Sequence, residues 1–151
     1  MSLDTTAEED AILNRLRSNL WSGRVHPEVP DEEDLERDLS TGLILPYIVL
    51  TFGTIFPLGQ DQSIEGAAQQ PHVLPFVAES WGATRNDARA GANGIIKLLT
   101  GWKPSADNAS EIVLTGGGGG FANYDQGRPV RFLRPVAGSC GVNMSIDDAL
   151  I

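Results

Sequence analysis

The segment Tyr47-Ile-Val-Leu-Thr-Phe52 constrains the fold more than any other part of the chain. It is rich in β-branched and aromatic residues, it is apolar on both faces, and it lies between Pro46 and Gly53. A short segment that is apolar on both faces is typical of a strand buried on both sides. We therefore expect residues 47–52 to form a central strand in the middle of a sheet.

Two helices are predicted on either side of this strand in the sequence. Thr6-Ala7-Glu8-Glu9 matches a capping box, and the apolar residues after it recur at helical spacing up to about Leu20. The second helix runs from a cap at Thr84 to about Leu99 and ends at Gly101. Small residues on its apolar face would let it lie close against the sheet; the face comprises Ala88, Gly91, Ala92, Ile95, Ile96 and Leu99.

The remaining strands are predicted in the second half of the chain. His72–Trp81 alternates as a strand, and Pro75 within it favours an edge position or a bulge. Glu111–Thr115 is a further short strand. Two last strands, Val130–Val136 and Ser139–Met144, are expected to join at Ala137-Gly138 in a hairpin that closes the sheet.

Together these elements predict one α+β domain over residues 1–151. The chain has 151 residues and 41% apolar content, which is enough for a single core. We expect an antiparallel or mixed β-sheet with two main helices packed on it and long loops between the elements. Residues 1–5 and 146–151 are expected to be peripheral tails.

Three connecting segments stand out by composition. Gly23–Gly42 is acidic and punctuated by proline, and Asp31 can cap one or two helical turns with Leu35 and Leu39 on one side. Residues 54–71 form a connection longer than a compact domain needs. The five glycines at 116–120 offer no side chains for packing and predict a mobile loop.

The net charge of −9 is concentrated in the N-terminal quarter of the chain. Residues 1–40 hold eleven acids and four bases, or −7, whereas residues 41–151 hold nine acids and seven bases, or −2. An acidic domain repels phosphate backbones, which argues against nucleic-acid binding as a main activity and leaves basic partners open.

Neither membrane insertion nor secretion is indicated. The longest apolar run, Leu43–Leu50, is broken by Pro46 and is shorter than the ~20 residues that span a bilayer. Cys140 is the only cysteine, so an intramolecular disulfide is impossible and a reducing compartment fits.

The glycine-rich segment formally matches a dinucleotide-binding fingerprint. Gly117-x-Gly119-x-x-Ala122 follows a predicted strand, as that motif requires. The motif also needs a following helix, but Asn123–Pro129 is typical of turns. A flexible loop is therefore favoured over cofactor binding, and no cofactor is expected.

The sequence offers no evident catalytic or metal-binding arrangement. His26 and His72 are the only histidines, and their spacing builds no metal site. Cys140 could pair with one of them as a nucleophile, but its place in an alternating strand favours a buried structural thiol. Residues 31–38 lack the spacing of a calcium loop, so a solvated acidic face is favoured there.

Several residues are candidates for a subunit or partner interface. Three tryptophans each end an apolar element, which suits either the edge of a core or an interface anchor. Three arginines near the last strands suit a partner surface or ordinary solvation, and residues of the long loops can order against neighbouring subunits. The candidates are Trp21, Trp81, Trp102, Phe56, Gln60, Gln62, Gly118, Arg128, Arg131 and Arg134.

The order of elements resembles the tail terminator, or tail completion, proteins of long-tailed bacteriophages. The features that carry the resemblance are the capped first helix, Pro46-Tyr47-Ile-Val-Leu-Thr-Phe-Gly53, a strand before Ser80-Trp81, the helix that closes on Leu98-Leu99-Thr100-Gly101-Trp102-Lys103-Pro104, and the two last strands. The resemblance covers about residues 7–145. The acidic segment before Gly42 and the five-glycine run have no counterpart in it.

This resemblance implies a structural virion protein and not an enzyme. Such a subunit, assembled in the host cytoplasm, forms a ring that is expected to be a hexamer at the junction of tail and neck. The ring caps the tail tube protein, ends tube polymerisation and offers its other side to the head connector, while DNA passes through its lumen without specific binding. The alternatives are another neck, head-completion or tail tube component and, from another class, a small-molecule or nucleotide-binding enzyme.

Overall fold

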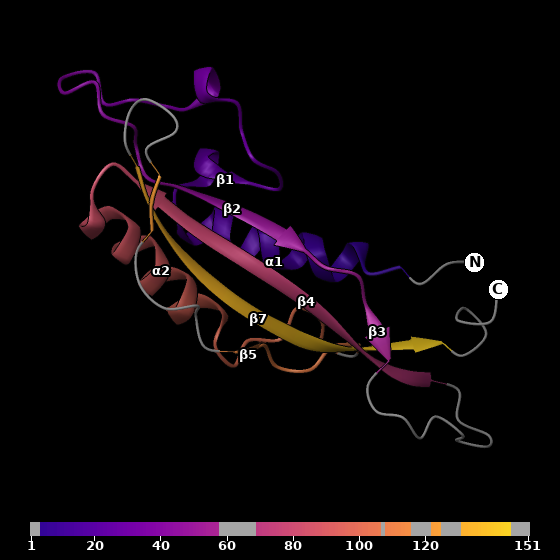
Figure 1. The fold of residues 1–151 in the computed structure, drawn as a ribbon. Coiled ribbons are helices and arrows are strands. Elements are labelled where there is room, and N and C mark those ends of the chain that lie inside the picture. Colours follow the sequence, from indigo (N-terminus) through magenta and orange to yellow (C-terminus); the bar gives the residue numbers. More distant parts are fainter. Residues whose placement is uncertain (1–3, 58–68, 107, 116–121, 125–130, 146–151) are drawn as a thin grey trace.

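The computed structural model describes residues 4–57, 69–106, 108–115, 122–124 and 131–145. These residues form one α+β domain with two helices and a mixed sheet, which confirms the predicted fold class. The strands lie in the order β1-β2-β4-β7-β5, with β3 beside β4 and β6 beside β7 (Figure 1). β1 pairs with β2 in parallel, and all other pairings are antiparallel.

The bounds of these elements are as follows. The helical segments are α1 (Thr6–Asn19), α2 (Arg85–Leu99) and the 3₁₀ turns η1 (Ser22–Arg24) and η2 (Glu32–Asp34). The strands are β1 (Val25–His26), β2 (Tyr47–Phe52), β3 (Phe56–Pro57), β4 (Gln69–Gly82), β5 (Val113–Leu114), β6 (Ala122–Tyr124) and β7 (Arg131–Ser145).

β4 and β7 form the longest pairing in the described structure. Their register runs without interruption from Gln69 opposite Ser145 to Gly82 opposite Phe132. The predicted hairpin at Ala137-Gly138 is therefore wrong, because β7 continues straight through these residues. Gly138 serves close packing and not a turn: a Cβ there would lie 2.7 Å from Cζ of Phe76.

β4, and not β2, occupies the middle of the sheet. β2 lies between β4 and the short β1, so its predicted central position is also wrong. β4 was expected at an edge of the sheet because it contains Pro75, but the missing N–H of Pro75 does not prevent β4 from pairing with β7. The Gly53 N–H donates to the Pro75 carbonyl at 2.9 Å, so the side of Pro75 that lacks an N–H faces β2 and β3 and not β7.

A bulge does occur beside Pro75, but in the neighbouring strands. Gly53 lies opposite Pro75, and the next pair is Phe56 opposite Val73. Residues 54 and 55 of the β2–β3 connection therefore face only residue 74 of β4, which is the pattern of a β-bulge. The missing donor of Pro75 coincides with the place where ladder pairing is already interrupted.

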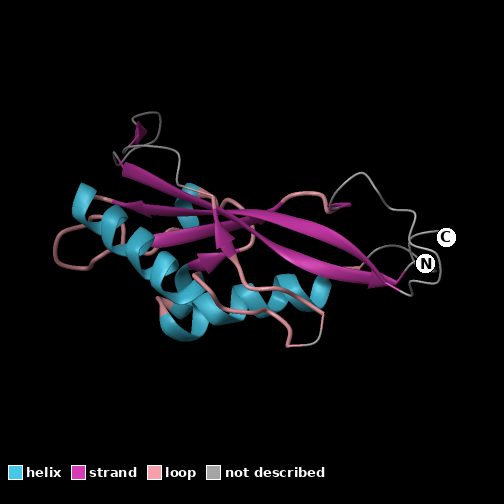
Figure 2. Cartoon of the chain, turned by 90° about the horizontal axis from the view of Figure 1, so that it is seen from below, coloured by secondary structure: helices cyan, strands magenta, loops and turns pink. Residues whose placement is uncertain are grey.

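Both long helices cover one face of the sheet, and the main core lies beneath them (Figure 2). The Thr84 hydroxyl accepts a hydrogen bond from the Asp87 N–H at 3.1 Å, which confirms the predicted cap of α2. α1 begins one residue earlier than its predicted box, with Thr5 as N-cap. The buried residues shared by helices and sheet include Ile12, Leu16, Ile48, Leu50, Leu74, Ala92, Ile95 and Val136.

The acidic segment after β1 covers one end of the opposite face. Leu35 and Ile44 are buried there against Tyr47 and Val49, so β2 is covered on both faces, as its composition predicts. The short helix expected after Asp31 is a single 3₁₀ turn, η2. Leu39 was expected to share a face with Leu35, but it is fully exposed because the chain turns back between Arg37 and Ile44.

The close contact between α2 and β4 yields a stability prediction. A Cβ at Gly91 would lie 2.1 Å from Oγ of the buried Ser80, which finds no hydrogen-bond partner in the described part of the chain. We expect Gly91→Ala to lower the free energy of unfolding by about 1–3 kcal/mol in urea titrations, although alanine favours helices. Adding Ser80→Ala should restore part of that loss.

Gly94→Ala is the matched control in the same helix. Its Cβ would meet only the end of the flexible Leu20 side chain, at 2.8 Å, so a smaller loss is expected. A Gly91→Ala protein as stable as the wild type would contradict the close approach of α2 to the sheet.

Candidate functional site

The structure describes six of the ten candidate interface residues. These six are Trp21, Trp81, Trp102, Phe56, Arg131 and Arg134, whereas Gln60, Gln62, Gly118 and Arg128 lie outside the described residues. Of the six, Trp81 and Arg131 are brought together. Arg134 lies opposite Ser80 in the β4–β7 register. The role of Trp21, Trp102, Phe56 and Arg134 in an interface stays a prediction.

Trp81 and Arg131 belong to an aromatic cluster at the end of the sheet covered by the acidic segment. Tyr47 lies opposite Trp81 in the β2–β4 register, and the two rings stack with centroids 6.0 Å apart and planes 3° apart. The Arg131 guanidinium lies 5.6 Å from the Trp81 ring centroid. Its Nη1 also donates to the Tyr47 hydroxyl at 2.9 Å. One arginine therefore holds both stacked rings.

Burial is the main cause of the pKa shifts in this cluster, as expected for side chains that pack within the fold. Burial raises the pKa of Tyr47, and the Arg131 charge opposes the shift only in part, so Tyr47 is a neutral phenol at neutral pH. Burial also raises the pKa of Glu79, against a hydrogen bond with Trp81. The His26 ring meets the Tyr47 ring edge-on, with centroids 6.0 Å apart. Burial together with the Arg17 charge lowers the pKa of His26.

The other two tryptophans are covered by arginines in the same way. The Arg15 guanidinium lies 5.1 Å from the Trp102 ring centroid, and its Nε donates to the Leu98 carbonyl at 3.1 Å. The Arg24 guanidinium lies 5.5 Å from the Trp21 ring centroid. Both rings are partly buried against the main core. Sequence reasoning missed Arg15 as the partner of Trp102, because no local pattern marks a side chain that meets a ring from a distant segment.

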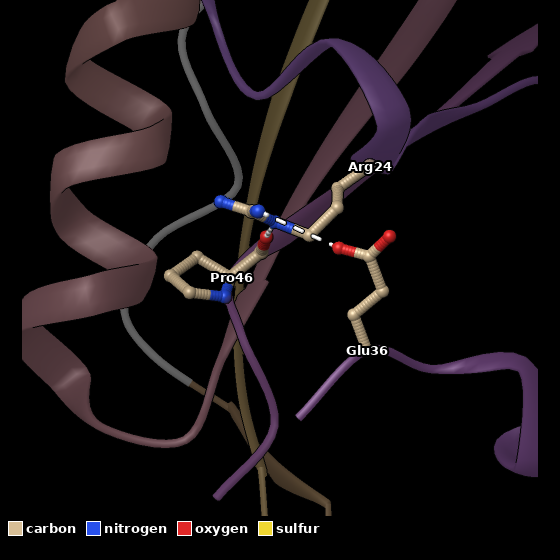
Figure 3. A network of polar contacts seen from close by, with 3 residues as sticks. All are labelled: Arg24, Glu36 and Pro46. Carbon is tan, nitrogen blue, oxygen red and sulfur yellow. Dashed lines mark hydrogen bonds and ion pairs between the residues drawn. The ribbon is translucent and has the colours of Figure 1, made fainter. Parts of the chain in front are cut away.

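Arg24 also ties the acidic segment to the sheet (Figure 3). Its Nε donates to the Pro46 carbonyl at 2.7 Å, directly before β2, and its Nη1 lies 3.6 Å from a carboxylate oxygen of Glu36. The Glu36 side chain is 57% exposed, so that ion pair contributes little. The bond to Pro46 is the stronger of the two, since it is short and charge-assisted.

Cys140, the single cysteine, is poorly suited to nucleophilic catalysis. Leu74 pairs with Cys140 and His72 with Val142, so Cys140 and His72 share a face of adjacent strands, and both are buried. Burial, assisted by the Glu8 charge, raises the pKa of the Cys140 thiol to about 11. The thiol is therefore protonated at neutral pH, and its burial agrees with the predicted packing role.

Other chemical readings find little support in the described residues. There, no three His, Cys, Asp or Glu side chains are grouped so as to hold a metal ion. The strand β6 begins at Ala122, so the glycine-rich segment leads into a strand and not into the helix that a dinucleotide site requires. Among the described helices, none has the length and apolar character needed to cross a membrane.

An apolar surface remains on the sheet face opposite the two helices. Phe56, Val77 and Val113 are 48%, 37% and 62% exposed, respectively. The register places them on one face, because Phe56 lies opposite Val73, Val77 opposite Ala137, and Val113 opposite Ser139. We call this surface the apolar sheet patch; it comprises Phe56, Val73, Pro75, Val77, Val113 and Ala137. Of these, sequence reasoning named only Phe56 as an interface candidate.

Comparison with known proteins adds no relative. The sequence matches no family model, and no curated protein matches it. Function is therefore inferred from the surface of the folded chain and from the order of its elements.

The contact between Arg131 and the aromatic cluster can be tested by substitution. We expect Arg131→Met to lower the free energy of unfolding by about 2 kcal/mol, because it removes a charge-assisted hydrogen bond and a cation–π contact. Arg37→Met is the control: Arg37 is exposed and makes one long bond, at 3.3 Å, to the Gly42 carbonyl. A double-mutant cycle with Tyr47→Phe should reveal coupling, whereas additive effects would contradict the shared contact.

Proposed function

We propose that this protein is a tail terminator, a structural subunit that assembles into a ring on the end of a phage tail tube. The ring stops tube polymerisation and joins the tail to the head connector. Support comes from the order of elements that carries the resemblance: α1, the apolar strand after Pro46, the strand that ends at Ser80-Trp81, and α2 followed by Gly101-Trp102-Lys103-Pro104.

The apolar sheet patch is the observation that carries this proposal furthest. A small domain ordinarily covers both faces of a sheet or exposes polar side chains on the open one. In the part of the chain that the structure describes, the helices cover one face, and the acidic segment covers the end of the other face near Tyr47. The remaining part presents Phe56, Val77 and Val113 to solvent. Such a surface suits a subunit that is completed by assembly with other chains.

The charge of the chain supports a passive relation to DNA. Residues 1–40 carry −7 of the net −9. A ring through which DNA slides must not hold the phosphate backbone, and an acidic subunit repels it. The protonated thiol of Cys140 supports the same view, since a structural subunit needs no nucleophile.

Loss of the protein should change tail length. Each ring added to an open tube recreates the same unsatisfied end, so a tube without its terminator continues to grow. A phage lacking this chain should accumulate tailless heads beside tubes of excessive, variable length in electron micrographs. Val77→Asp combined with Val113→Asp should reproduce that defect while the protein stays folded, because both side chains are exposed.

Ser18→Asp, at an exposed position on α1 away from the patch, is the matched control and should complement the null phage. Uniform tails of normal length that lack heads would favour a head-completion role instead. Normal infectious particles without the protein would contradict both roles.

A further inference from the structure

The acidic segment forms an ordered, projecting lobe. Residues 28–38 carry seven acids and one base. The chain turns back on itself through the bridge between Arg37 and Ile44, and the Asp38 carboxylate accepts hydrogen bonds from the N–H and hydroxyl of Ser40. These bonds lower the pKa of Asp38, which keeps it ionised. We call residues 28–43 the acidic lobe; its tip holds Leu39 fully exposed.

The exposed side of α2 carries the opposite charge. Residues 85–103 contain four bases and the single acid Asp87. Arg85, Arg89 and Lys97 are exposed and fall on one stripe of the helix, and Ile96, 43% exposed, lies among them. The Arg85 guanidinium is held 5.8 Å from the Phe132 ring centroid. We call this stripe the basic helix face.

The two surfaces lie on opposite sides of the sheet. The acidic lobe is seated through Leu35 and Ile44 on the face that bears Tyr47 and Val49. α2 is seated on the other face, where Gly91 meets Ser80. In Figure 1 the lobe accordingly stands above the strands and α2 below them. The two surfaces therefore point away from each other within one subunit, and each can meet its complement only on another copy.

We propose that neighbouring copies contact each other through these surfaces, with the acidic lobe of one subunit against the basic helix face of the next. This inference rests on the proposed ring and names the contact that builds it. Two different surfaces on opposite sides of a subunit give a heterologous contact, which forms a ring when the rotation between neighbouring subunits closes and an open filament when it does not. The opposite charges fix the orientation of the neighbours, and Leu39 and Ile96 supply apolar contact area.

Charge reversal on each surface tests the contact. The lobe variant combines Glu28→Lys, Glu32→Lys, Glu33→Lys and Asp34→Lys, which changes the net charge of residues 28–38 from −6 to +2. The helix variant combines Arg89→Glu with Lys97→Glu, which changes the net charge of residues 85–103 from +3 to −1. All six side chains are exposed. Each variant alone places like charges together, so we expect it to require about 100-fold or more higher concentration for ring assembly, measured by mass photometry. Circular dichroism and thermal melts confirm that each variant is folded.

An equimolar mixture of the two variants provides the sharper test. The reversed lobe of one meets the reversed helix face of the other, and the two unreversed surfaces also match, so rings of alternating subunits should form. Asp10→Lys combined with Glu111→Lys is the control for the lobe variant, because it also replaces exposed acids by lysine but at positions outside both surfaces, and it should assemble like the wild type.

The outcomes separate this inference from the proposed function. If wild-type protein caps tubes while either variant alone assembles equally well, or while the mixture fails to recover, the contact is wrong and the proposed function stands. A lobe variant that forms rings but no longer caps tubes would instead assign the lobe to the tube protein and overturn the contact. Wild-type protein that neither forms rings nor caps tubes would overturn both.

Discussion

The antiparallel pairing of β4 with β7 is the interaction on which the rest of the structure depends. Its uninterrupted register sets the face on which each side chain lies. Leu74, Ala78 and Val136 fall beneath the helices, and Trp81 and Leu133 fall on the opposite face. Pro75 is compatible with this pairing, because its side that lacks an N–H donor faces the bulge between β2 and β3 and not β7. The acidic lobe and the basic helix face, which we assign to assembly, lie on these two opposite faces.

The sheet face opposite the two helices combines a stable core around Tyr47 with an exposed apolar surface. Arginines cover the three tryptophans, so the largest aromatic rings contribute to the stability of the subunit itself. The exposed apolar area comes instead from Phe56, Val77 and Val113. Arg24 holds the acidic segment where it covers only one end of the sheet. The acidic segment completes the core around Tyr47 at that end of the sheet. The apolar sheet patch lies outside this end and stays exposed.

Local patterns predicted the elements better than their arrangement. The cap at Thr84 could be predicted because its partner, Asp87, is three residues away. The small residues of α2 could be predicted because they repeat along one face of the helix. Ala137-Gly138 was misread as a turn, since glycine at a close approach and glycine in a turn look alike without the partner, here Phe76. Residues brought together from distant segments, such as Arg131 with Tyr47 and Trp81, leave no periodic signal. The apolar sheet patch was not predicted for the same reason, because its residues come from separate segments that only strand pairing brings together.

A tail terminator has one defined place in the intact particle, at the end of the tail tube. A virion imaged by cryo-electron microscopy, with this chain tagged at a terminus, would show where the protein sits and how its copies are arranged. We expect one ring at the end of the tail tube next to the head, with copies related by rotation about the tail axis. Copies distributed along the tube, or particles that lack the chain, would contradict it.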